Sequence, residues 1–203
     1  MTITLFIIIV TALISVTCFS NRSNLDKLIF SPYIIKRHKD QWFRFITGGF
    51  IHGDFVHLFF NMFVLYSFGN ALEQGFFPEI FGSYYRLGYI VFYISAIGMA
   101  DIYTYIKHQD NPGYRSLGAS GAVSAVTFAC ILFAPKMNLW VMGINMPGYI
   151  YGILYLVYST YASKKNLGNI AHDAHLWGAI YGLVFPLLFN PGLLTNLIKQ
   201  ITR

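Results

Sequence analysis

The chain has 203 residues, of which 56% are hydrophobic and only 11% are charged, and its formal net charge is +6. Charged residues make up about a quarter of a typical soluble domain, so this composition excludes an ordinary soluble protein and predicts a membrane protein. The positive charge does not indicate a nucleic-acid partner. Its lysines and arginines are spread over loops and tails, where we expect them near lipid headgroups.

A helix needs about 20 mostly apolar residues to span a bilayer. Six segments approach this length, at about residues 2–20, 55–73, 84–106, 117–134, 148–163 and 172–190. They leave no room for a separate soluble domain, so we expect residues 1–203 to form a single transmembrane domain. The first segment lacks a basic start and a small-residue cleavage site, and we interpret it as a span rather than a signal peptide.

The longest expected connection between spans covers residues 21–54, and its second half mixes aromatic with basic side chains. This pattern is typical of the bilayer interface, where rings lie at headgroup depth and cationic groups reach toward water. By the positive-inside rule, the six lysines and arginines within this loop would place it in the cytoplasm and the N-terminus outside.

Polar side chains are costly to bury in a membrane protein, and His57 and Asn61 are the first pair of them along the chain. The two residues are four apart and therefore share one face of the 55–73 span. They indicate either a water-filled cavity or hydrogen bonds to a neighbouring helix. His52 and His57 are five apart, which is not a common zinc-binding spacing, so we predict no metal site.

The 117–134 span has a narrow face, because small residues recur in it at intervals of four. They are Gly118 with Ala122, and Gly121 with Ala125 and Ala129. This spacing allows the backbone of another helix to approach closely. Ser120 lies within the run, and taken alone it is best interpreted as part of that packing face.

A second narrow face occurs in the 172–190 span, where Ala174, Gly178 and Gly182 recur at intervals of four beside His175. A single intramembrane histidine usually bonds a neighbouring helix. Two narrow helices can pack closely, however, and would then bring the Ser120 hydroxyl within reach of the imidazole, as an activated nucleophile requires. The 55–73 span would add an amide and a second imidazole as donors to an oxyanion.

Asp173 is not expected to complete a triad, because it lies about 200° from His175 around the helix. We therefore predict a Ser–His dyad. His172 is near enough to cap or hydrate the site, but we assign it no catalytic role.

At these residues the sequence resembles the rhomboid family of intramembrane serine proteases. The matching motifs are GxSG at 118–121, AHxxGxxxG at 174–182, HxxxN at 57–61 with His52 five residues before it, and an aromatic–arginine pair at Phe43–Arg44. They occur in the family's order, and the resemblance extends from about residue 42 to residue 185. Each motif alone is weak, whereas their combination is specific.

The resemblance implies an all-α membrane protein, a rhomboid-like bundle of six transmembrane helices whose long first loop lies partly in the outer leaflet. Ser120 would be the nucleophile, and His175 the general base and later the general acid. Asn61, His57 and the Ser120 backbone N–H would form the oxyanion hole. The residues expected to support and pack the site are Gly118, Gly121, Gly178, Gly182, His52 and Arg44.

The resemblance also implies substrates that are single-pass membrane proteins, cleaved in or near the lipid bilayer, with no metal and no cofactor. The location would be a bacterial plasma membrane, with a water-filled cavity opening to the outer side. The 148–163 span and the 164–171 loop would be the gate and the lid. Both termini would lie in the cytoplasm, against the charge count, and we follow the family because the first loop folds into the interface.

One departure from the family pattern affects the site directly. Some members carry a tyrosine four residues after the serine, stacked on the catalytic imidazole, whereas this sequence has Ser124 there. The departure removes that stacking contact but leaves the dyad.

Two other classes of function remain open on the sequence. A rhomboid-like protein without activity would bind transmembrane helices, but such proteins typically lack the serine or the histidine, and this chain keeps both. A small transporter or channel would need polar groups toward both membrane sides, whereas the sequence concentrates them at one depth.

Overall fold

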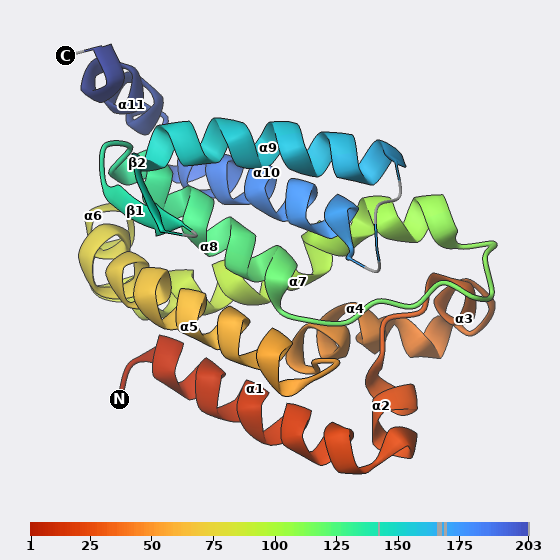
Figure 1. Ribbon diagram of the computed structural model, residues 1–203. Coiled ribbons are helices and arrows are strands. Elements are labelled where there is room, and N and C mark those ends of the chain that lie inside the picture. The colour runs from red at the N-terminus through yellow and green to blue at the C-terminus, as the bar shows by residue number, and fades with distance from the viewer. Residues whose placement is uncertain (142, 166–167, 169, 203) are drawn as a thin grey trace.

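Helices dominate the computed structural model, which describes residues 1–141, 143–165, 168 and 170–202 (Figure 1). The helices of the first half are α1 (Ile3–Ser20), α2 (Arg22–Leu28), α3 (Pro32–Arg37), α4 (Arg44–Thr47), α5 (Phe55–Ala71) and α6 (Phe77–Phe81). The second half contains α7 (Tyr85–His108), α8 (Ser120–Phe133), α9 (Gly148–Lys165), α10 (His172–Phe189) and α11 (Gly192–Thr202), with strands β1 (Asn138–Val141) and β2 (Ile144–Pro147) between α8 and α9.

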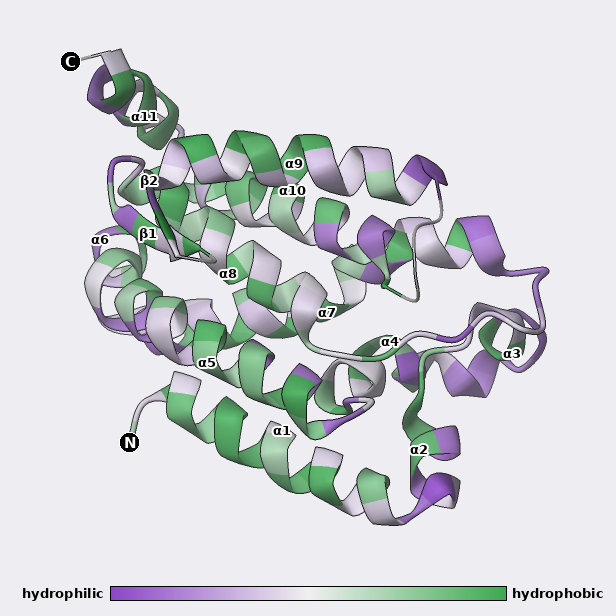
Figure 2. Cartoon of the chain, viewed as in Figure 1, coloured by the Kyte–Doolittle hydropathy of each residue, from purple (hydrophilic) through white to green (hydrophobic). Residues whose placement is uncertain are grey.

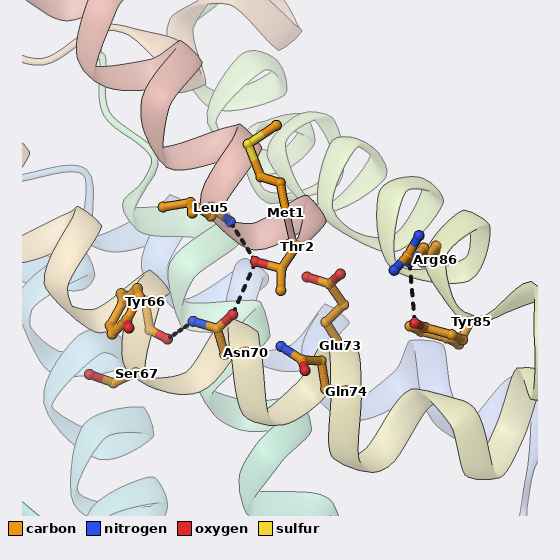
Figure 3. Close-up of a pocket in the computed structure, with 10 residues that line it drawn as sticks. All are labelled: Met1, Thr2, Leu5, Tyr66, Ser67, Asn70, Glu73, Gln74, Tyr85 and Arg86. Carbon is orange, nitrogen blue, oxygen red and sulfur yellow. Dashed lines mark hydrogen bonds between the residues drawn. The ribbon is translucent and has the colours of Figure 1, made fainter.

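The start of α1 is fixed to the far end of α5 by a buried carboxylate. Glu73 is 1% exposed, and its two oxygens accept hydrogen bonds from the backbone N–H groups of Ile3 and Thr4, each at 2.8 Å. A carboxylate at the N-terminus of a helix accepts hydrogen bonds from the free backbone N–H groups there and interacts favourably with the helix dipole. Figure 3 shows this corner of the bundle, where the Thr2 hydroxyl also donates to Asn70 at 3.2 Å.

The connection between the expected spans 55–73 and 84–106 is made of short helical turns. A π-helical turn (η3, Leu72–Phe76) continues α5 into α6, and a 3₁₀ turn (η4, Gly82–Tyr84) leads into α7. Gly82 has a φ of 52°, a conformation that favours glycine, and α7 runs back along the bundle from this point (Figure 1).

Helix α8 lies at the centre of the bundle and contacts α5, α7, α9, α10 and α11. The expected start at residue 117 is wrong: Gly118 has a φ of 115°, which an α-helix does not accept, and the helix begins at Ser120. Its 14 residues span about 21 Å, less than the hydrocarbon thickness of a bilayer. Residues 121–133 are all buried, so protein rather than lipid surrounds this helix.

The expectation of an all-α fold needs one correction. Strands β1 and β2 form an antiparallel hairpin whose register runs from Asn138 opposite Pro147 to Val141 opposite Ile144. The hairpin lies at the end of the bundle where α8 finishes and α9 begins (Figure 1). Helix α9 starts directly after it, at Gly148 as expected.

The outer surface of the bundle is strongly apolar. Large hydrophobic side chains are exposed along α1, α5 and α9, among them Phe6, Leu13, Phe59, Phe63, Ile153 and Val157. Figure 2 shows hydrophilic residues gathered in α2 and α3 and at the adjoining end of α7. An apolar surface of this extent on the outside of a helix bundle indicates contact with lipid.

By length and apolarity, two described helical stretches are able to cross a membrane, Ile3–Ser20 and Phe55–His108. A third is obtained if α10 and α11, which meet at 117°, are counted as one broken span. The chain is thus a mostly helical membrane protein, and the count of six spans stays a prediction.

The expected first loop is largely made of short helices, α2 to α4 with the 3₁₀ turns η1 (Lys39–Phe43) and η2 (Gly48–Phe50). Arg44 is 7% exposed and donates to the carbonyl oxygens of Asp26 and Ile29, both at 2.9 Å, and to the Gln41 side chain. Burial lowers the pKa of its guanidinium from the ordinary value. Arg44 therefore holds the segment around α2 together.

Candidate active site

Helices α5, α8 and α10 all begin at the same end of the bundle, where α7 finishes (Figure 1). The polar residues singled out in the sequence lie in the first turns of these helices or just before them. The bundle therefore gathers them at one end (Figure 1).

The contact between α8 and α10 is close because glycines line it. A Cβ atom added at Gly178 would lie 2.1 Å from the carbonyl oxygen of Gly121, and one added at Gly182 would lie 2.1 Å from that of Ala125. These distances leave no space for a side chain, so the two backbones touch directly. The small residues at intervals of four thus set the distance between the two helices.

This close packing brings the first residue of α8 to the first turn of α10. The Ser120 hydroxyl oxygen lies 2.7 Å from Nε2 of His175, within hydrogen-bonding distance. An imidazole nitrogen that accepts from a hydroxyl can remove its proton during nucleophilic attack. The arrangement is therefore chemically suited to acyl transfer.

His52 is fully buried and links α1 to the backbone that leads into α8. The Ser15 hydroxyl donates to the Phe50 carbonyl at 3.1 Å, so it accepts from Nδ1–H of His52, 3.0 Å away. Nε2 is then free to accept from the Ala119 N–H at 3.4 Å. Only the neutral imidazole makes both contacts, and burial, followed by the charge of His57, lowers its pKa to about 3.

His57 and Asn61 lie beside the dyad, on the first turns of α5. A Cβ atom at Gly118 would lie 2.7 Å from Cε1 of His57, so the imidazole rests on the bare backbone of this glycine. The Asn61 amide donates to the His57 carbonyl at 3.0 Å. Both side chains line the same cavity as Ser120.

Asp173 is engaged away from the dyad. Its carboxylate accepts from Lys107 at 2.8 Å and from the Ser163 hydroxyl, and thus ties α10 to the ends of α7 and α9. His172, one turn before His175, presents its ring edge to that imidazole at a centroid distance of 6.1 Å. Part of the expected lid, residues 166, 167 and 169, lies outside the described residues.

A cavity of about 960 Å³ lies over these groups. Ser120, His175, His57 and Asn61 line it, together with loop residues such as Asp54 and Asn111. A second, smaller hollow of about 180 Å³ reaches Ser120 and His175 from between α5, α8 and α9. The dyad is therefore accessible from the loop end of the bundle and also borders a pocket on its side.

The sequence reasoning missed two residues of this region, Ser15 and Tyr155. Ser15 is fully buried on a face of α1 that also carries the buried residues Thr4 and Thr11, and this recurrence of polar residues in an apolar helix is a usable signal. Tyr155 of α9 hydrogen-bonds Ser124 at 2.5 Å and lies near His175. In the sequence, the only signal for such a partner was the serine at position 124, where some family members carry a tyrosine.

Comparison with known proteins agrees with the class that the fold defines, a helical membrane protein. A family model described as "Rhomboid domain" matches residues 39–191. "RHOMBOID-like protein 12, mitochondrial" of Arabidopsis thaliana is 31% identical over an alignment of 145 positions, which covers 66% of this chain and 42% of that protein. "Putative rhomboid protease YdcA" of Bacillus subtilis (strain 168) is 28% identical over 148 residues, covering 73% of this chain and 67% of the relative.

The chain therefore belongs to the rhomboid family, as the sequence motifs predicted. It aligns with less than half of the length of the plant relative.

Substitution Gly178→Ala should separate α8 from α10, because the new methyl group would overlap the Gly121 carbonyl. We expect a loss of about 1–3 kcal/mol in the free energy of unfolding, as for overpacked cores. Thermal unfolding in detergent measures it, with Gly75→Ala as the control, since nothing lies within 4 Å of a Cβ there. Equal unfolding temperatures for the two variants would contradict the close packing.

Stability should fall in acid because of His52. Its pKa in the folded chain, about 3, lies below the value of about 6.5 for a free imidazole. Folding thus favours the neutral imidazole. The contribution of His52 to the free energy of unfolding is complete above pH ~6.5 and is lost as the pH falls toward 3. The wild-type unfolding temperature should decline more steeply over this range than that of His52→Gln. Parallel curves would show that His52 does not contribute in this way.

Proposed function

We propose that this chain is an intramembrane serine endopeptidase that cleaves transmembrane segments of single-pass membrane proteins. The observation that carries the proposal is the 2.7 Å contact between the Ser120 hydroxyl and His175 Nε2, at the floor of a cavity of about 960 Å³. Family membership supports the same activity class. The substrates are inferred from that membership alone.

In the proposed mechanism, Ser120 Oγ attacks the carbonyl carbon of the scissile peptide bond while His175 Nε2 takes the hydroxyl proton. The tetrahedral intermediate collapses as His175 returns this proton to the leaving amine, which leaves an acyl-enzyme. Water then attacks the ester while His175 takes its proton, and His175 returns this proton to Ser120 Oγ as the ester bond breaks and the carboxylic product is released. No step requires a metal or a cofactor.

The oxyanion is the charge that the site has to stabilise. Ser120 is the first residue of α8, and the first N–H groups of a helix have no acceptor within it, so the Ser120 N–H is available. The side chains of Asn61 and His57 line the same cavity and supply further donors. We assign the oxyanion hole to these three groups.

The membrane arrangement is part of the proposal. Helices α1, α5, α7, α8, α9 and α10 would be the six spans, with the short central α8 shielded from lipid by the others. The cavity would open to the outer side of a bacterial plasma membrane, below a first loop lying at the interface, and both termini would be cytoplasmic. Such a cavity brings in the water that hydrolysis consumes and the bilayer core lacks.

The second candidate function is a rhomboid-like protein that binds transmembrane helices without cleaving them. The intact serine–histidine contact argues against it, because a binding protein does not need an activated hydroxyl. Covalent labelling of Ser120 by a fluorophosphonate probe separates the two.

Replacing Ser120 by alanine should abolish cleavage while leaving the fold intact, because the nucleophile is lost and only one buried oxygen is removed. The assay compares the two purified proteins in liposomes on a labelled transmembrane substrate, with thermal unfolding as the control for folding. Equal cleavage by wild type and Ser120→Ala would refute the proposed function.

Replacing Asn61 by alanine should lower kcat by about 10²- to 10³-fold with a smaller change in KM, as for the loss of one oxyanion donor. The same liposome assay measures it. The control is Asn70→Ala, at the opposite end of the bundle, where the Asn70 amide donates to Tyr66 and not to the site. A kcat that is the same in both variants would remove Asn61 from the oxyanion hole.

A further inference from the structure

Within the part of the chain that the structure describes, the His175 imidazole has no acidic partner to orient it. Among the described residues, no carboxylate is hydrogen-bonded to this ring, and the neighbouring Asp173 is bound to Lys107 and Ser163 instead. A general base nevertheless has to keep its ring in one orientation to accept a proton from the serine. Two rings are its neighbours, those of Tyr155 and His172.

Tyr155 makes the more parallel of these contacts. Its ring lies 6.4 Å from the His175 ring, centroid to centroid, at an interplanar angle of 24°. The tyrosine ring is itself packed against Phe128 of α8 at 5.3 Å and against Tyr151 one turn earlier on α9 at 5.6 Å. These two packing contacts therefore hold the Tyr155 ring in place beside the imidazole.

The hydroxyl of Tyr155 ties the same side chain to the nucleophile. The Ser124 hydroxyl donates its proton to the Ser120 carbonyl at 2.8 Å, so it accepts from the Tyr155 hydroxyl, 2.5 Å away. One side chain of α9 is thereby linked to the backbone of Ser120 and placed beside the ring of His175.

We propose that Tyr155 is the positioning residue for the His175 imidazole. It takes the role of the tyrosine that some family members carry at the position where this chain has Ser124. The proposal rests on the proposed protease function. It has a mechanical consequence, because Tyr155 belongs to α9, which lies at the outside of the bundle and packs on α8, α10 and the hairpin. The orientation of the base therefore depends on the docking of α9.

The side pocket of about 180 Å³ connects the docking of α9, and with it the orientation of His175, to substrate entry. Tyr155 lines it together with Ser120, His175 and Phe60 of α5. A substrate segment that enters between α5 and α9 has to pass Tyr155 before its peptide bond reaches the serine. Substrate entry and alignment of the base thus involve the same side chain.

The test compares Tyr155→Leu with Tyr161→Leu, the same substitution at an exposed tyrosine of α9 that lines neither the cavity nor the side pocket. Each is assayed for cleavage in liposomes and for the rate of fluorophosphonate labelling, which reports on the dyad without a transmembrane substrate. Tyr155→Leu should lower kcat and the labelling rate together by about 10- to 100-fold, as for a slightly misplaced catalytic group, with KM within about twofold. Tyr161→Leu should stay within about twofold in both rates.

Two conservative variants isolate the hydroxyl. Tyr155→Phe keeps the ring and should retain most of the labelling rate that Tyr155→Leu loses. Tyr155→Phe and Ser124→Ala break the same hydrogen bond, so the double variant should label no more slowly than the slower single variant.

The outcomes distinguish the two proposals. If the wild type neither cleaves nor labels, the proposed function fails. If the wild type is active and Tyr155→Leu labels as fast as Tyr161→Leu, or changes only KM, Tyr155 lines the substrate path or the core and does not position His175.

Discussion

Direct contact between the backbones of α8 and α10 is the constraint on which the rest of the site depends. With Gly178 against the Gly121 carbonyl and Gly182 against that of Ala125, the two helices are as close as the chain allows. The distance between Ser120 and His175 is then set by main-chain contact, which has few alternative arrangements, rather than by flexible side chains. A hydroxyl and an imidazole on different helices are thereby held 2.7 Å apart.

The surroundings of the dyad stabilise the segment in front of α8 from two other helices. Gly118 adopts a backbone conformation that favours glycine. Because it has no side chain, the ring of His57 from α5 packs directly on its backbone. His52, bridged to Ser15 of α1, accepts from the Ala119 N–H. The start of α8 is thus fixed by groups from α1, α5 and α10, which is consistent with a preorganised site.

The periphery is built differently from the centre. Helix α9 carries a wide apolar outer surface, contacts α10, α8 and the hairpin, and contributes Tyr155 to the neighbourhood of the dyad. Residues 121–133 of α8, by contrast, are buried throughout. The centre of the site is closely packed, and one side of it is formed by the outer helix α9. This arrangement is suited to admitting a long substrate from the side, as the proposed function requires.

The sequence alone predicted a membrane protein, the family and the residues of the candidate site, because apolar length, small-residue spacing and short motifs are local properties of the chain. It also predicted that two narrow helices would bring Ser120 to His175. It did not predict the helical turns through residues 72–84, the hairpin, the late start of α8 or the position of Tyr155. These depend on contacts between segments far apart in the chain, such as that of Tyr155 with Ser124, and only the packed bundle decides which side chains meet.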